Sequence, residues 1–210
     1  MKHLFFIISF IYWGCNAQTI KPLFHNTGYG KESNVYYKDI DNNFGPYVGT
    51  WLYTNGTTSF KIILKKREMI PKTIGDLSFY MDYLIGEYQY IENGIEKVNT
   101  LNSILLEYDN MIDYNLSSTG IVGNTNYPKC TTCPLNERRI SMMFNEPSHR
   151  NVAGLGAGLM LRKVTENGVE KIKATLYGRG VSMGYTIPDQ QPTTIDRYSL
   201  PYGEYTLIKQ

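Results

Sequence analysis

Short runs in which apolar and polar residues alternate recur along most of this chain, and each run has the length of a strand. β-Branched and aromatic residues are frequent in these runs, whereas long stretches of Leu, Ala, Glu and Lys at helical spacing are missing. The chain holds eighteen tyrosines, whose rings cover a pleated sheet while their hydroxyls stay in water. The pattern predicts an all-β protein.

Three Asn-Gly dipeptides stand between such runs, where one strand would turn back into the next. They are Asn55-Gly56, Asn93-Gly94 and Asn167-Gly168. A tight type I′ turn needs positive φ at both central residues, a conformation that asparagine and glycine adopt readily. Each dipeptide therefore predicts an antiparallel hairpin.

The first of these turns predicts how the strands around it pair. If Asn55-Gly56 is a two-residue loop, Trp51 lies opposite Phe60. One face of the hairpin is then mostly apolar, and we expect it to be buried: Tyr47, Gly49, Trp51 and Tyr53 against Thr58, Phe60, Ile62 and Leu64.

The turn at Asn167-Gly168 predicts a second apolar face, with Leu159 opposite Leu176. The other face of this hairpin places Arg162 opposite Lys173. This like-charge pair destabilises the hairpin by roughly a few tenths of a kcal/mol. A slip of one residue would turn the leucines outward, so we keep this register.

Residue patterns also predict strands and loops in other segments. Residues 79–90 are apolar on both faces with Gly86 in the middle, which predicts a strand with a bulge or a bend. We expect further strands at 103–108, 138–144 and 202–209. Segments 115–134 and 185–201 are rich in Gly, Asn, Pro, Ser and Thr and are predicted to be long loops.

The N-terminus has the form of an export signal, residues 1–17, which leaves 18–210 as one β-barrel-like domain. Lys2 precedes an apolar run over residues 4–13, which as a helix reaches only about 15 Å, too short to cross a bilayer. Residues 11–15 resemble a bacterial lipobox, in which Cys15 is lipidated and becomes the first residue. Cleavage after Ala17 would instead release a free secreted chain.

The charge of the chain gives little sign of a polyanionic partner. The net charge is +2, and the single basic run, residues 65–67, is followed directly by Glu68. A nucleic-acid footprint is not indicated.

Cys130 and Cys133 are the strongest candidates in the sequence for a disulfide, a metal site or a redox pair. A redox pair would need the first cysteine at a helix start, and here Pro134 follows the second. A zinc site needs about four ligands, and after removal of the signal only His25 and His149 could join the cysteines. In an oxidising compartment a disulfide is the favoured reading, ahead of metal binding and redox catalysis, and we expect no metal and no cofactor.

No residue can be assigned to catalysis from the sequence. Glu107, Asp109 and Asp113 lie close together and read as a solvated edge instead of a pair of glycosidase carboxylates. His149 has no evident partner, no serine lies in Gly-x-Ser-x-Gly, and the glycines of 154–158 lack dinucleotide-loop spacing.

Gly49-Thr50-Trp51 at the head of a strong strand resembles the Gly-x-Trp signature of lipocalins. With the lipobox-like end, residues 48–53 and the closing segment 203–209, the chain also resembles an uncharacterised family of small secreted proteins and lipoproteins of Bacteroidetes. These resemblances imply an antiparallel, lipocalin-like up-and-down barrel or a strongly curved meander, in which Trp51 closes the barrel floor.

Such a barrel can enclose one small molecule. The leading hypothesis is therefore a noncatalytic, exported protein that binds an apolar or amphipathic ligand through inward-facing residues: Tyr47, Trp51, Tyr53, Phe60, Leu159 and Leu176. It would sit in the cell envelope, held to a membrane through Cys15, or be secreted or periplasmic. A structural or interaction module of the envelope is the second hypothesis, and an esterase or glycosidase is the third.

Overall fold

The structure, a computed structural model, describes residues 18–24, 30–150, 152, 155–179 and 197–210. The predicted signal with Cys15, Gly154 and most of the predicted loop 185–201 lie outside the described residues. The strands are β1 (Thr19–Pro22), β2 (Val35–Lys38), β3 (Gly49–Asn55), β4 (Thr58–Ile74), β5 (Leu77–Glu92), β6 (Ile95–Asn99), β7 (Leu116–Val122), β8 (Arg139–Phe144), β9 (Ala157–Glu166), β10 (Val169–Gly178) and β11 (Gly203–Lys209).

Four short 3-10 helices complete the elements of the described chain: η1 (Gly45–Tyr47), η2 (Leu101–Leu105), η3 (Met111–Asp113) and η4 (Pro147–His149). Within the described residues, no helix is long and apolar enough to cross a membrane.

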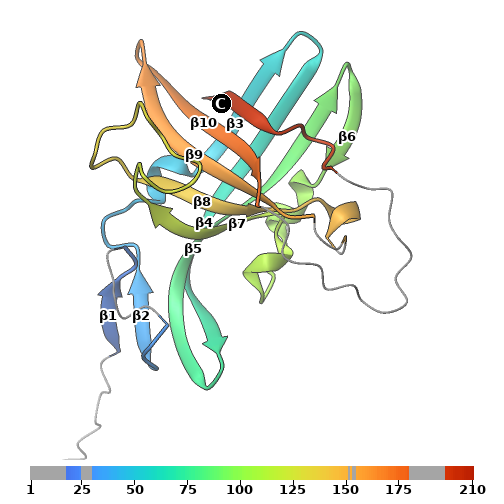
Figure 1. The fold of residues 1–210 in the computed structure, drawn as a ribbon. Coiled ribbons are helices and arrows are strands. Elements are labelled where there is room, and N and C mark those ends of the chain that lie inside the picture. The colour runs from blue at the N-terminus through green and yellow to red at the C-terminus, as the bar shows by residue number, and fades with distance from the viewer. Residues whose placement is uncertain (1–17, 25–29, 151, 153–154, 180–196) are drawn as a thin grey trace, which may run out of the picture.

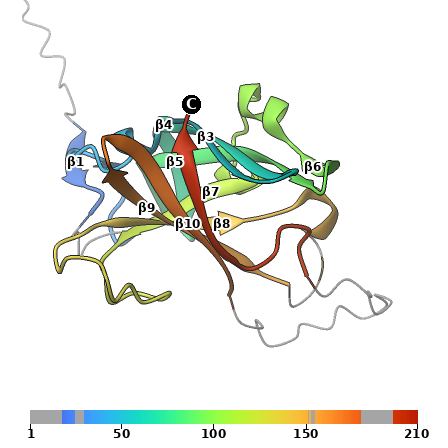
Figure 2. The same ribbon diagram turned by 90° about the horizontal axis from the view of Figure 1, so that it is seen from above.

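Eight of the strands close into an antiparallel barrel, in the order β3, β4, β5, β7, β8, β9, β10 and β11 (Figures 1 and 2). The ring is closed by β11 and β3, where Lys209 pairs with Trp51. Every neighbouring pair in the ring is antiparallel. Strand β6 lies outside the ring and pairs with β5. The predicted all-β, up-and-down barrel is confirmed.

A second, smaller layer extends the barrel at its N-terminal side. The edge of the long strand β5 that faces away from β4 pairs first with β2, then with β7 and then with β6 along its length. The pairing of β2 with β5 is parallel, and so is that of β1 with β2, which places both strands beside the far end of the β4–β5 hairpin (Figure 1).

The third hairpin has the predicted register. Leu159 pairs with Leu176, and Asn167 and Gly168 have φ of 53° and 76°, as a type I′ turn requires. The like charges Arg162 and Lys173 do lie opposite each other. Each has an acidic partner, since Glu137 binds Arg162 and Glu166 lies 3.5 Å from the Nζ of Lys173.

The register of the first hairpin differs from the prediction by two residues. Trp51 pairs with Ile62, and Phe60 pairs with Tyr53, because Gly56 and Thr57 form the turn while Asn55 stays in its strand. A shift of two residues leaves every side chain on its predicted face, so the buried face is as expected.

Gly86 was expected to mark a bulge or a bend, and the ladders show no register shift there. A Cβ at this position would lie 2.6 Å from Cδ2 of Leu64 and 2.8 Å from the backbone oxygen of Ile63. Close approach of the neighbouring strand therefore requires glycine. The bulge lies instead in β4 between Arg67 and Ile70, where Met69 has φ of 55°.

Two predicted elements are wrong and two are confirmed. Residues 103–108 form part of η2 and a loop instead of a strand, and the predicted loop 115–134 contains β7. In β7 the hydroxyl of Ser118 accepts a hydrogen bond from the backbone N–H of Leu84, so a Ser-rich strand is satisfied inside the sheet. The strands expected at 138–144 and 202–209 are β8 and β11.

Trp51 sits in the barrel wall with no exposed surface. Its Nε1 donates to the backbone oxygen of Tyr47 over 2.8 Å. The Nζ atoms of Lys163 and Lys209 lie 5.2 and 5.6 Å from the ring centroid, and both lysines bind Glu170, whose pKa they lower to about 2. The aromatic residue is therefore sealed from water by a charged cap.

A buried polar cluster joins β2, β4 and β5 outside the barrel. The carboxylate of Asp82 accepts from the hydroxyl of Tyr36 over 2.5 Å and from the backbone N–H of Met69 over 3.1 Å. The Nζ of Lys66 lies 3.6 Å from Asp82 and 3.9 Å from Asp39, the second buried carboxylate. Burial and the bond to Asp82 raise the pKa of Tyr36.

Candidate functional site

The structure packs the six residues predicted to face a ligand into one apolar core. Trp51, Phe60 and Leu159 have no exposed surface, and the edge of the Tyr53 ring meets Tyr205 at a centroid distance of 5.2 Å. Tyr47 and Leu176 are also buried, although Tyr47 belongs to η1 instead of a strand. A side chain without accessible surface borders no space that water can enter, which holds for Trp51, Phe60 and Leu159, whereas Tyr53 is only partly buried.

A chain of aromatic contacts leads from that core to one end of the barrel. Phe60 meets Tyr88 at 6.0 Å between ring centroids, Tyr88 meets Phe144 at 4.9 Å, and Phe144 meets Tyr198 at 5.4 Å. Tyr198 is buried, with 5% of its surface exposed, and borders an open cleft. The packed interior thus supplies a rigid floor for that cleft.

This cleft, here called the mouth cleft, has a volume of about 660 Å³. It is built by the end of β5, by β6, by η4 and by the segment before β11, and it is lined by Glu92, Lys97, His149, Arg197, Tyr198, Ser199, Leu200, Pro201 and Tyr202. The hydroxyl of Tyr205 donates to the backbone oxygen of Pro201 over 2.6 Å and holds the last of these segments on the barrel.

A buried carboxylate orients the imidazole of His149 in the mouth cleft. Glu146 is 2% exposed and accepts from the backbone N–H and the hydroxyl of Ser199, over 2.9 and 2.7 Å. The Nδ1 of His149 lies 3.1 Å from Oε1 of Glu146 and 2.7 Å from Oγ of Ser148. With Nδ1 engaged in this way, Nε2 is the ring nitrogen left for a ligand.

The rest of the cleft has an aromatic wall and a charged rim. The rings of His149 and Tyr198 lie 5.6 Å apart, and Tyr202 is half exposed. Burial raises the pKa of both tyrosines, so their hydroxyls are neutral donors at neutral pH. On the rim, Lys97 lies 3.5 Å from Glu92.

A family model, described as a family of unknown function (DUF6705), matches residues 1–210. The chain belongs to this family. No curated protein and no solved structure matches the chain. The geometry of this DUF6705 protein is therefore the basis on which its function can be argued.

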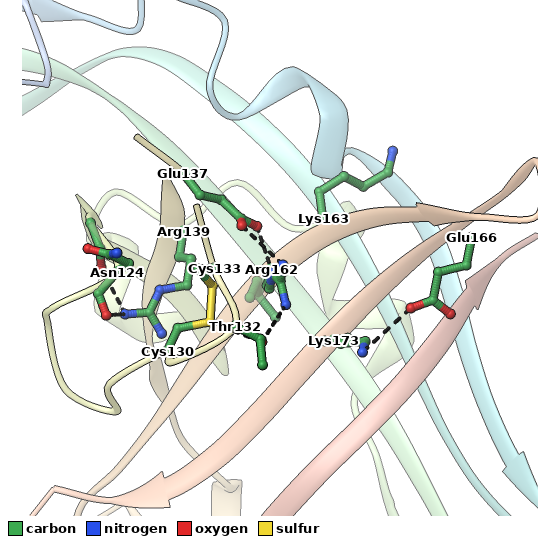
Figure 3. Close-up of polar contacts among 12 residues, drawn as sticks. Asn124, Cys130, Thr132, Cys133, Glu137, Arg139, Arg162, Lys163, Glu166 and Lys173 are labelled. Carbon is green, nitrogen blue, oxygen red and sulfur yellow. Dashed lines mark hydrogen bonds and ion pairs between the residues drawn. A yellow bond between two sulfur atoms is a disulfide. The ribbon is translucent and has the colours of Figure 1, made fainter. Parts of the chain in front are cut away.

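In this DUF6705 chain, Cys130 and Cys133 are joined by a disulfide, with 5.5 Å between their Cα atoms (Figure 3). The bond lies in the segment between β7 and β8, which is held on the outside of the barrel by Arg139. The guanidinium of Arg139 donates to the backbone oxygens of Pro128, Gly123 and Asn126 over 2.7 to 2.8 Å. In the part of the chain that the structure describes, no group of three or more His, Cys, Asp and Glu residues is placed to hold a metal ion.

The remaining sequence candidates lie apart from the mouth cleft. Glu107, Asp109 and Asp113 are exposed on the loop region between β6 and β7, as a solvated edge would be. At Gly158 a Cβ would lie 2.5 Å from the Tyr177 ring, so this glycine serves close packing.

Sequence reasoning missed the partner of His149, although it stands only three residues away. The spacing Glu146-x-x-His149 puts the two side chains on one side of the η4 turn. The spacing of Glu146 and His149 is visible in the sequence. It predicts that the two side chains interact only when a turn at Pro147 is assumed.

Proposed function

We propose that this protein is an exported, noncatalytic binding protein that takes an amphipathic small molecule in its mouth cleft. The observation that carries the proposal is the cleft itself, because a volume of about 660 Å³ with an aromatic floor and a few oriented polar groups is typical of small-molecule sites. This keeps the ligand class expected from the sequence and moves the site from the barrel interior to its end.

The lining residues favour a ligand with a flat apolar body and a polar or negatively charged group. The body would stack on the half-exposed Tyr202, and a donor group would meet Nε2 of His149. Lys97 on the rim would attract an anionic group.

The fluorescent probe anilinonaphthalenesulfonate, which has an aromatic body and a sulfonate, tests the proposal. We expect saturable binding to one site, weakened about five- to tenfold by Tyr202→Ala, since one aromatic contact contributes about 1 to 1.5 kcal/mol. The melting temperature should stay nearly unchanged, because Tyr202 is 49% exposed.

The matched control is Tyr80→Ala, which removes an exposed tyrosine of β5 far from the cleft lining. It should leave the affinity for the probe unchanged. Equal affinities in the parent and both variants would contradict the proposal, and the interaction-module hypothesis would then replace it.

We further propose that the protein is held in the cell envelope by a lipid on Cys15. The lipobox-like residues 11–15 after a short apolar run support this, together with the resemblance to secreted lipoproteins. In a bacterial host supplied with labelled fatty acid, the parent should carry label and Cys15→Ala should carry none. Equal labelling of the two would rule out the anchor, and a mature chain that starts at Gln18 would show cleavage after Ala17.

Hydrolysis is the second candidate function, and the Glu146–His149 pair in the cleft favours it. The two nearby serines are not placed as nucleophiles. Ser148 lies against Nδ1, the nitrogen that already faces Glu146, and the hydroxyl of Ser199 donates to Glu146. Hydrolysis of p-nitrophenyl acetate above the buffer rate, lost in His149→Gln, would establish this candidate over noncatalytic binding.

A further inference from the structure

A second cleft, here called the loop cleft, lies beside the disulfide-bonded segment. Figure 3 labels several of its lining residues, among them Cys130, Arg162 and Lys173. Its volume is about 420 Å³. One side is formed by the segment between β7 and β8, and the other by the outward faces of β8, β9, β10 and β11. The lining residues are Pro128, Lys129, Cys130, Thr132, Arg139, Met160, Arg162, Lys173, Thr175 and Glu204.

Positive charge is in excess around this cleft. Four cationic side chains line it, those of Lys129, Arg139, Arg162 and Lys173, against the single carboxylate of Glu204. Glu137 adds a second carboxylate from outside the lining, through bonds of 2.7 and 3.1 Å to Arg162. Glu166, 3.5 Å from Lys173, adds a third, so four cations face three carboxylates.

Lys173 is only weakly neutralised by its acidic neighbour. Its Nζ lies 3.5 Å from Glu166, which holds Lys171 more closely at 2.8 Å. Glu166 is itself exposed to solvent, so its interaction with Lys173 is screened. The ammonium of Lys173 is therefore available to a bound anion.

Arg139 adds a fixed positive charge to the wall of the cleft. The residue is 3% exposed, and its hydrogen bonds go to neutral backbone oxygens. Among the described residues its Nε has no hydrogen-bond partner, and Glu137 is a carboxylate close enough to act on its charge. Burial lowers the pKa of Arg139, but a guanidinium stays protonated, so its field acts through a region of low dielectric constant.

We propose that the loop cleft is a binding site for a tetrahedral oxyanion, a phosphate or sulfate group, either free or as the monoester of a larger molecule. Lys129 and Lys173 supply the charge, and the hydroxyls of Thr132 and Thr175 supply neutral donors. The Cys130–Cys133 bond fixes the rim from which Lys129 and Thr132 project. The site is separate from the mouth cleft and shares no lining residue with it.

Amide chemical shifts, followed by NMR during titration with inorganic phosphate and with a sugar phosphate, test this site at constant ionic strength in chloride. Saturable shifts are expected at Cys130, Thr132, Lys173 and Thr175. Lys173→Met should weaken the affinity about tenfold, the loss expected for a charge-assisted hydrogen bond. The control Lys65→Met, at an exposed lysine of β4 outside the cleft lining, should stay within about twofold.

Tighter binding of the sugar phosphate than of inorganic phosphate would identify a monoester as the ligand, and equal binding would identify the free ion. Both results support the site. Shifts that do not saturate, shifts that chloride reproduces, or equal losses in the Lys173 and Lys65 variants would overturn it.

Discussion

Replacing Trp51 by alanine should lower the free energy of unfolding by about 3 to 5 kcal/mol, the range for a large buried aromatic residue. The side chain has no exposed surface and packs in the core beside Ile62, its partner in β4. The substitution also removes the ring over which Lys163 and Lys209 lie. This ring is close to the ladder that joins β11 to β3. We therefore expect Trp51→Ala to weaken both the closure of the barrel and the packing of its core.

Urea unfolding followed by circular dichroism measures this loss. Ile208→Ala is the matched control, because Ile208 lies in the same β11–β3 ladder but is 45% exposed, and it should cost less than about 1 kcal/mol. A Trp51→Ala protein as stable as this control would show that the residue does not hold the barrel closed.

Asp82→Asn should also be damaging, with a loss of about 3 kcal/mol, because an amide cannot accept from every donor that this buried carboxylate binds. Asp82 is fully buried, and its carboxylate accepts from the Tyr36 hydroxyl and from the backbone N–H groups of Met69 and Asp39. Lys66 would keep acidic neighbours, since its Nζ lies 2.9 Å from Glu68 and 3.9 Å from Asp39. The cluster ties β2 and the β4 bulge to β5, so its loss should loosen the smaller layer.

Asp76→Asn in the exposed β4–β5 turn is the control for this substitution, and it should be nearly silent. If Asp82→Asn unfolds at the same urea concentration as Asp76→Asn, this buried carboxylate contributes nothing to the fold.

Turn chemistry accounts for what the sequence predicted about the barrel. At Asn167-Gly168 both central residues have positive φ and the register follows at once. At Asn55-Gly56 the turn moved by one residue, to Gly56 and Thr57, and Gly56, with φ of 58°, takes the first central position, where a type II′ turn needs glycine. The prediction of buried faces survived, since a shift of two residues preserves the alternation.

Strand β7 was missed because its residues look like those of a loop. Ser117 and Ser118 are buried, and such residues favour strands only when the neighbouring chain supplies hydrogen-bond partners. Those partners come from β5 and β8, which are distant in the sequence. Local pattern cannot contain that information.

The two candidate clefts were beyond sequence reasoning for the same physical reason. The mouth cleft joins Lys97, His149 and Tyr202, and the loop cleft joins Lys129 and Lys173, in each case from segments far apart along the chain. Only closure of the barrel brings them together. The disulfide between Cys130 and Cys133 was predictable from the sequence, because the two cysteines are closely spaced and the predicted export would place them in an oxidising compartment.

The central claim, that a ligand binds at the end of the barrel and not within it, is tested most directly by mapping probe-induced amide shifts on the mature protein. With anilinonaphthalenesulfonate, saturable shifts should concentrate at Lys97, His149 and residues 198–202. The packed layer around Trp51, Phe60, Leu159 and Leu176 should stay unchanged. Saturable shifts centred on that layer, with none at the mouth cleft, would contradict the account.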